Sequence, residues 1–186
     1  KNLYLYILLI LVSSNAFSIP TGLDSWIKSN MKKYNIVGLS IAIINDGKIS
    51  ETKTYGYADK ENKIKVNKKT LFQAASISKP ITATATMITF QNNPKLSLDA
   101  PINNYLKKWK VPKSKLTEDT PVTMKLLLQH AGGITGARYK GYPYDQKLPT
   151  TVEVLNGECP SNTPGVTIVA APGTKTIYSP YGYTII

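Results

Sequence analysis

The stretch LFQAASISKP, residues 71–80, places Ser76 three positions before Lys79 and follows the lysine with Pro80. A proline has no backbone N–H, so in a helix it fits without penalty only in the first turn. A helix is therefore expected to begin at or just after Ser76, with its free backbone N–H groups and positive dipole end beside that residue. Lys79 should share the face of Ser76, because residues three apart are neighbours on a helix.

This pair of residues has the chemistry of a nucleophile and its base. A serine hydroxyl is a poor nucleophile until a base removes its proton, and a lysine shielded from water near a positive helix end can have a pKa low enough to do so. The same helix end would stabilise charge that develops on an attacked carbonyl oxygen. A plainer alternative is that Ser76 only caps the helix. Four letters alone do not choose between the two.

Before this stretch, the sequence predicts a helix and a β-hairpin. Residues 23–34 carry apolar side chains at helical spacing with lysines on the other side, which indicates an amphipathic helix. Residues 37–58 hold two strand-like runs on either side of Asn45, Asp46 and Gly47, a typical hairpin turn. The polar, lysine-rich segment 59–69 is expected to be a surface connection.

After it, short helices and a long irregular region are expected. Residues 96–109 and 122–133 have the pattern of short helices, the second capped by Gly132 and Gly133. Residues 141–173 are rich in Pro, Gly, Thr and Asn and predict an irregular excursion. The segment ITATATMITF, residues 81–90, alternates Thr and Ala with a period of two, which by propensity favours a strand, whereas its isoleucines also fit one side of a helix.

Composition limits the classes of function. The chain has 186 residues and a net charge of +12, from 23 Lys and Arg against 11 Asp and Glu. Arg138 is the only arginine, which argues against a nucleic-acid partner, because contacts to bases and phosphates favour arginine. The chain has one cysteine, Cys159, so it can form no intrachain disulfide. With only one histidine, His130, beside that cysteine, the sequence argues against a metal site built from His and Cys ligands. No cofactor is expected.

The N-terminus resembles an export signal. Lys1 is followed by the apolar run Leu3–Val12 and then by small residues that end at Ser18. The run is about half of the ~20 residues that a spanning helix needs. We therefore expect a signal peptide over residues 1–18, cleavage before Ile19, and an exported chain, periplasmic or secreted, without a stable membrane anchor. The alternative is an uncleaved anchor.

Four segments together are similar to one known family. They occur in the family's order: TLFQAASISKPITA (70–83), LSLDAPINNYL (96–106), LLLQHAGGIT (126–135) and PGTKTIYSPYGY (172–183). The chain resembles, from about Leu23 to its last residue, the serine beta-lactamase-related family of class C beta-lactamases, D-alanyl-D-alanine carboxypeptidases and esterase relatives. Serine, two residues and lysine form the nucleophile motif of beta-lactamases and penicillin-binding proteins.

The resemblance implies a fold, a reaction and three catalytic residues. The implied fold is α+β, beta-lactamase or penicillin-binding-protein-like, with an antiparallel sheet, flanking helices and a helical region that carries Ser76. The implied reaction is acyl transfer through an ester on Ser76, with Lys79 as its base partner and Tyr178 sharing the proton transfer. An ester, a D-alanyl peptide from peptidoglycan or a beta-lactam would be the substrate. This resemblance also favours the helical alternative for residues 81–90.

Two departures from the family pattern qualify these expectations. Pro180 stands where many members carry an asparagine whose amide holds the acyl side of the substrate. The third family motif, Lys or His followed by Thr or Ser and Gly, has no counterpart before Ile186. The strand that bears this motif supplies an oxyanion donor, and losing one such donor typically costs ~10²–10³ in rate. The interpretation is therefore that residues 19–186 are the N-terminal portion of a serine hydrolase domain; the alternative is a catalytically impaired remnant that binds cell-wall peptide or protein.

Two further residues are expected to have no catalytic role. His130 lies in the segment HAGGI, which is similar to a family stretch, and is expected to be a helix-end histidine bonded to backbone. Cys159 lies between Glu158 and Pro160, without a basic neighbour to lower its pKa, and is expected to be a passive thiol.

Overall fold

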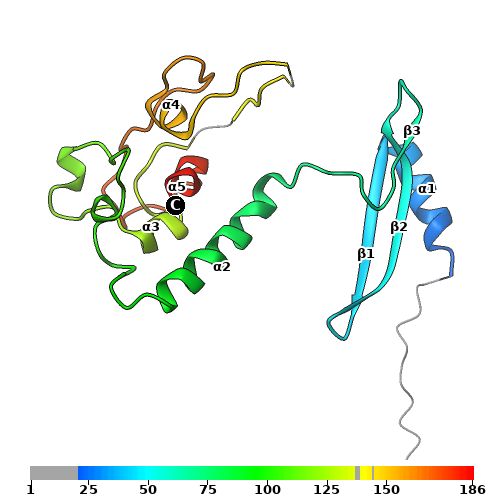
Figure 1. Ribbon diagram of the computed structural model, residues 1–186, viewed down its shortest axis with the longest axis horizontal. Helices are drawn as coiled ribbons and strands as arrows, with labels where there is room; N and C mark the ends of the chain where they lie inside the picture. Colours follow the sequence, from blue (N-terminus) through cyan, green and yellow to red (C-terminus); the bar gives the residue numbers. More distant parts are fainter. Residues whose placement is uncertain (1–20, 137–138, 144) are drawn as a thin grey trace, which may run out of the picture. The chain divides into compact units, whose positions relative to one another are not determined.

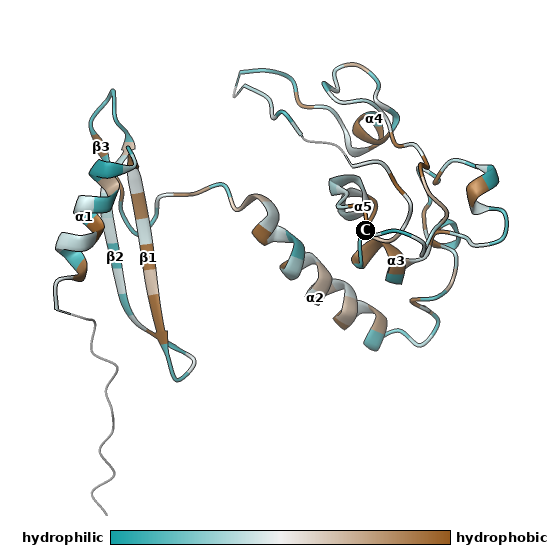
Figure 2. Ribbon diagram, turned by 180° about the vertical axis from the view of Figure 1, so that it is seen from behind, coloured by the Kyte–Doolittle hydropathy of each residue, from teal (hydrophilic) through white to brown (hydrophobic). Residues whose placement is uncertain are grey.

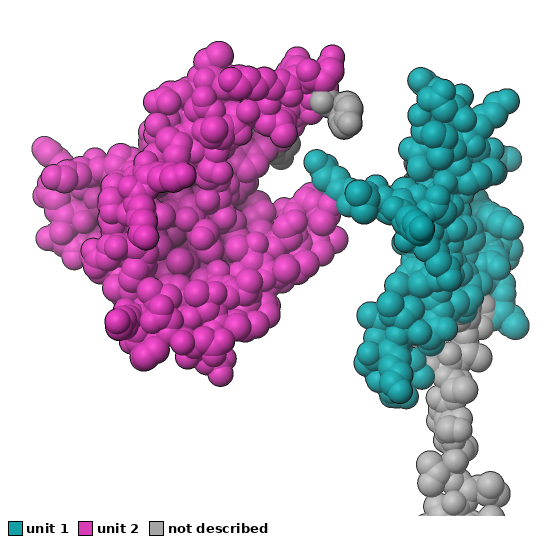
Figure 3. Space-filling model, viewed as in Figure 1, with its two compact units in different colours: residues 1–73 teal, residues 74–186 magenta. Residues whose placement is uncertain are grey.

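The computed structural model describes residues 21–136, 139–143 and 145–186. The chain forms two compact units, one that ends at Gln73 and one that runs from Ala74 to Ile186 (Figures 1 and 3). The predicted signal peptide, residues 1–18, lies outside the described residues. Among the helices that are described, none is long and apolar enough to cross a membrane.

The first unit contains the predicted helix and hairpin. Helix α1 spans Leu23–Lys33, and the antiparallel strands β1 and β2 span Gly38–Asn45 and Lys48–Asp59. The two residues between the strands, Asp46 and Gly47, have φ values of 48° and 71°, as a type I′ hairpin turn requires. Strand β1 is rich in hydrophobic residues, which are brown in Figure 2. Both expectations for this region are confirmed.

A third strand, β3 (Ile64–Lys65), adds to the sheet in the order β1-β2-β3. Residues 59–69 were expected to be only a surface connection, and the expectation missed this short strand. The strand turns back onto β2, where Lys65 pairs with Tyr57. Val66, directly after it, is 6% exposed. A single buried valine among lysines does not produce the alternation of apolar and polar residues by which a strand is predicted from sequence.

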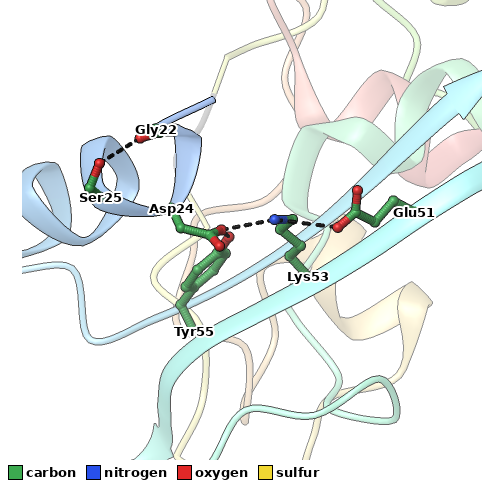
Figure 4. A network of polar contacts seen from close by, with 6 residues as sticks. All are labelled: Gly22, Asp24, Ser25, Glu51, Lys53 and Tyr55. Atoms are coloured by element: carbon green, nitrogen blue, oxygen red, sulfur yellow. Dashed lines mark hydrogen bonds and ion pairs between the residues drawn. The ribbon is translucent and has the colours of Figure 1, made fainter. Parts of the chain in front are cut away.

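Polar contacts tie α1 to β2 (Figure 4). The Asp24 carboxylate accepts hydrogen bonds from the Tyr55 hydroxyl at 2.5 Å and from Lys53 Nζ at 3.0 Å. Lys53 also lies 3.3 Å from the Glu51 carboxylate. The bond from Tyr55, and next the bond from Lys53, hold the pKa of Asp24 below its ordinary value. These contacts fix the helix against the strand by charge and hydrogen bonding.

In the second unit, helix α2 spans Ser78–Gln91 and follows a short 3₁₀ turn, η1, of Ala75–Ile77. The helical alternative for residues 81–90 is therefore confirmed. The alternating threonines fit a helix because each hydroxyl donates to the carbonyl four residues earlier: Thr82 to Ser78 at 3.0 Å, for example, and Thr84 to Pro80 at 2.8 Å. The alternation of Thr and Ala in this segment is therefore compatible with a helix, because the alanines are small and the threonine hydroxyls are hydrogen-bonded within it.

The predicted helix over residues 96–109 is wrong except for one 3₁₀ turn, η2, of Ile102–Asn104. Pro101 explains the difference, because its ψ of 127° is extended and a helix cannot run through it. After the turn, the Asn103 amide oxygen accepts from the Val111 backbone N at 2.8 Å and its amide nitrogen donates to the Val111 carbonyl at 3.1 Å. These two bonds hold the chain at Val111 beside the turn.

The helix predicted over residues 122–133 exists as α3, but it is shorter, Met124–Leu128. Its predicted glycine caps are wrong. His130, with φ 57°, takes the left-handed conformation two residues after the helix ends, and the Ala131 N donates to the Leu126 carbonyl at 2.7 Å. This bond is typical of a helix C-terminus, and histidine is one of the non-glycine residues enriched there.

Two helices that the sequence interpretation did not predict complete the unit. Helix α4, Thr151–Asn156, lies inside the region expected to be irregular and starts with a reciprocal capping box of Thr150 and Glu153. Helix α5, Pro180–Ile185, is capped by the Ser179 hydroxyl and has Pro180 at its first position. A third 3₁₀ turn, η3, spans Lys115–Thr117.

The core of this unit lies among α3, α4 and α5, which contact one another through α5. Its most deeply buried side chains are less than 2% exposed and come from distant segments: Ile102, Leu127, Ile134 and Tyr181. This core holds the C-terminal segment against α3, and so determines where Tyr178 lies. An antiparallel sheet with a helix beside it, and a separate helical region that carries Ser76, agree with the expected α+β class.

Candidate active site

Ser76 lies in the 3₁₀ turn directly before α2, and Pro80 is in the first turn of that helix. This is the local geometry that the sequence predicts. Ala75, next to Ser76, has φ 45°, a left-handed conformation that typically costs an alanine about 1–2 kcal/mol. The bend turns the chain from the preceding segment into the helix. Ser76 is exposed at this bend.

Lys79 and Tyr178 both reach the Ser76 hydroxyl. Lys79 Nζ donates to Ser76 Oγ at 3.1 Å. The Tyr178 hydroxyl lies 2.6 Å from the same oxygen, although the two residues are 102 positions apart in sequence. All three residues belong to the second unit. The structure therefore brings together the three residues that the sequence and the resemblance singled out.

The electrostatics of this cluster favour the ionised form of the tyrosine. The pKa of Tyr178 is lowered, first by hydrogen bonding from Lys79 and next by the bond with Ser76. The Lys79 ammonium also lies 4.9 Å from the centre of the Tyr178 ring, within the range of a cation–π contact. Tyr178 is 54% exposed, so water reduces the strength of these effects. A lowered pKa raises the fraction of Tyr178 that is phenolate, which is the form that can accept a proton.

The His130 ring contacts the rings of both Tyr178 and Tyr183. The His130 ring centre is 4.4 Å from that of Tyr178 and 5.2 Å from that of Tyr183. The Ser179 backbone N donates to His130 Nδ1 at 3.2 Å, so the expected backbone bond of this histidine is confirmed. Tyr183, whose ring lies 5.8 Å from Lys79 Nζ, was not predicted. Nothing in the sequence separates it from the eleven other tyrosines.

The residues after Tyr178 serve the fold. Ser179 is 3% exposed, its hydroxyl donates to the Thr135 carbonyl at 2.7 Å and it caps α5. Pro180 starts that helix and presents no amide to the site, as expected from its chemistry. Cys159 is free and exposed. Within residues 21–136, 139–143 and 145–186, no three His, Cys, Asp or Glu side chains are grouped to hold a metal ion.

A serine at a helix start, bonded by a lysine and a tyrosine, has the arrangement of an activated hydroxyl nucleophile. Fold and site together thus define a class of proteins in which a serine at a helix start is placed as an activated nucleophile. The family model described as Beta-lactamase matches residues 23–186. The chain belongs to this family, which confirms the resemblance read from the four sequence segments.

Individual relatives agree with this membership. A beta-lactamase of Pseudomonas fluorescens is 39% identical over 83 residues, which are 45% of this chain and 23% of that protein. Esterase EstB of Burkholderia gladioli is 30% identical over 122 residues, 66% of this chain and 31% of the esterase. The octameric penicillin-binding protein homologue of Pyrococcus abyssi superposes with a TM-score of 0.67 at 28% identity, over 87% of this chain and 36% of that one. The chain thus spans about a quarter to a third of the length of these curated relatives.

Proposed function

We propose that the protein containing this chain is a serine hydrolase that transfers acyl groups through a covalent ester on Ser76. The observation that carries the proposal is the convergence of Lys79 Nζ and the Tyr178 hydroxyl on Ser76 Oγ, at 3.1 Å and 2.6 Å. Ser76 does not cap the helix, since the N-cap of α2 is Ile77 and no side chain makes a capping bond there, so the capping alternative does not account for the site.

In the proposed first step, Ser76 Oγ attacks the carbonyl carbon of the substrate. The serine proton passes to the pair formed by Lys79 and Tyr178, since both lie within hydrogen-bond distance of Ser76 Oγ. The lowered pKa of Tyr178 raises the fraction of phenolate, the form whose oxygen can accept the serine proton, and the ammonium of Lys79 balances its negative charge. The positive dipole end of α2 lies beside Ser76 and favours the negative charge that develops on the attacked carbonyl oxygen.

The intermediate then collapses and is hydrolysed. The bond from the carbonyl carbon to the leaving group breaks, and the leaving group takes the proton that the pair received from Ser76. Water next attacks the acyl-serine ester, gives a proton to the same pair, and releases the acid while Ser76 Oγ regains its proton. No oxidant, metal or cofactor takes part in this sequence.

The proposed substrates are esters, D-alanyl peptides of peptidoglycan or beta-lactams, which share a reactive acyl carbon. Support comes from relatives described as a beta-lactamase, an esterase and a penicillin-binding protein homologue. Pro180 provides no side-chain amide for an acyl-side contact, since it is built into α5 as its first residue. This favours substrates that depend little on such a contact, esters first among them.

The test is covalent labelling of the full-length protein with a fluorophosphonate, which reacts with activated serines. Peptide mapping should place the adduct on Ser76, and Ser76→Ala should abolish it. Ser78→Ala is the matched control, because Ser78 is two residues away, at the first position of α2, and should label normally. An adduct on Ser78, or no adduct on either serine, would contradict the proposal.

We also propose that residues 1–18 are a signal peptide and that the protein acts outside the cytoplasm, in the periplasm or medium. The support is the sequence pattern alone, a lysine, a short apolar run and small residues before Ile19. N-terminal sequencing of protein recovered from those fractions should begin at Ile19. Recovery of the chain with its first residues intact in the membrane fraction would contradict cleavage.

A further inference from the structure

His130 is held in place by the end of α3. Its backbone N donates to the Leu127 carbonyl at 3.1 Å, and Leu127 is 1% exposed in the core. With φ 57°, the residue turns the chain sharply away from the helix. The His130 side chain therefore extends from a part of the unit that the core makes rigid.

From this position His130 contacts the chain on both sides of Tyr178. Its carbonyl accepts from the Ile177 backbone N at 2.8 Å, and its Nδ1 accepts from the Ser179 backbone N at 3.2 Å. Between these bonds, the imidazole lies against the Tyr178 ring with centres 4.4 Å apart. One residue thus restrains the backbone before and after the tyrosine, and also its ring.

The bond to Ser179 requires an unprotonated Nδ1, because a nitrogen that carries a proton cannot accept one. The groups that face the imidazole are Lys79 from α2, Tyr183 from α5 and Tyr178 itself. Burial, and next the positive charge of Lys79, hold the pKa of His130 below its usual value of 6.5. His130 is therefore neutral, with its proton on Nε2, at neutral pH.

We propose that His130 is a positioning residue, which in its neutral form holds the Tyr178 hydroxyl on Ser76 Oγ through its contacts with Ile177, Tyr178 and Ser179. The inference rests on the proposed acyl transfer at Ser76 and adds a residue that touches no substrate. Protonation at Nδ1 would remove the Ser179 bond and release the tyrosine. The 2.6 Å contact between the Tyr178 hydroxyl and Ser76 Oγ would then be lost, although neither Tyr178 nor Ser76 has itself changed its protonation.

Two substitutions separate positioning from folding. His130→Asn and His130→Gly both tolerate the left-handed backbone at this position. The asparagine amide oxygen can take the place of Nδ1 as an acceptor, whereas glycine provides none. The test is the rate of Ser76 labelling by a fluorophosphonate in the full-length protein between pH 4.5 and pH 8, with circular dichroism to verify that each variant is folded.

At pH 8, His130→Gly should label about 10²-fold more slowly than the wild type, the loss expected when a reacting group is displaced by about 1 Å. His130→Asn should recover at least about tenfold of that loss. The wild-type rate should also fall on the acid side, below pH 6.5, as His130 becomes protonated. This fall should be absent from His130→Asn, since the asparagine amide does not titrate.

Each other outcome is decisive. Equal rates in all three proteins would overturn the positioning role and leave the proposed function intact, whereas an unlabelled wild type would overturn both. An asparagine variant as slow as glycine, or one that keeps the acid limb of the wild type, would show that the Nδ1 bond is not what places the tyrosine. If His130→Gly does not fold, the acid limb of His130→Asn still decides.

Discussion

The Tyr178→Phe substitution is a sharp test of the site, because it removes one oxygen and little else. The ring remains, and with it the contact with the His130 ring at 4.4 Å between centres and the contact with Lys79 Nζ at 4.9 Å. What is lost is the hydroxyl 2.6 Å from Ser76 Oγ. If that oxygen accepts the serine proton, the acylation rate should fall by about 10²–10⁴-fold, the usual range for general acid–base groups.

The size of the effect distinguishes catalysis from stability. A fall of 10²–10⁴-fold corresponds to about 2.7–5.4 kcal/mol in the activation free energy. The net contribution of one hydrogen bond to folding is about 1 kcal/mol, and Tyr178 is 54% exposed. The free energy of unfolding should therefore change by no more than about 1 kcal/mol. A large loss of rate with a small loss of stability is the expected signature.

The assay is the rate of fluorophosphonate labelling, together with hydrolysis of p-nitrophenyl acetate, in the full-length protein. Tyr105→Phe is the matched control. Its hydroxyl exchanges hydrogen bonds with the Ser97 backbone at 2.8 Å and 3.2 Å and takes no part in the cluster around Ser76. That variant should lose some stability and keep its labelling rate. Labelling of Tyr178→Phe at the wild-type rate would refute the role assigned to the hydroxyl.

Two further predictions concern stability. Leu127→Ala, at a side chain 1% exposed, should lower the free energy of unfolding of the second unit by about 2–5 kcal/mol in urea titration, whereas Leu148→Ala, 66% exposed, should change it by less than about 0.5 kcal/mol; equal effects would contradict the assigned core. Because the pKa of Asp24 is lowered in the folded state, first by Tyr55, its contribution is present above the unfolded value near 3.8 and lost as pH falls through the folded value. Asp24→Asn should thus reduce the hydrogen-exchange protection of β1 and β2 at pH 6, and this difference should shrink progressively as the pH falls below 3.8; a difference that stays constant in acid would contradict this reasoning.

Sequence alone determined the features that depend on near neighbours. Pro80 restricts where a helix can begin, so the positions of Ser76 and Lys79 on one face followed from covalent geometry. The turn at Asp46 and Gly47 followed likewise from the few residues that accept positive φ. The local pattern was less reliable over residues 96–109, where the extended Pro101 interrupts the helix that the spacing of apolar residues predicted.

Tyr178 entered the interpretation through family resemblance, since no local rule separates it from the other tyrosines. Its approach to Ser76 across 102 positions results from the core that holds α5 against α3. The contacts of His130 with the backbone on both sides of Tyr178 were likewise beyond the sequence. Contacts of this kind depend on how buried side chains pack between distant segments. The sequence therefore determines the chemistry of each residue, whereas tertiary packing determines that Tyr178 reaches Ser76 Oγ, where Lys79 also binds.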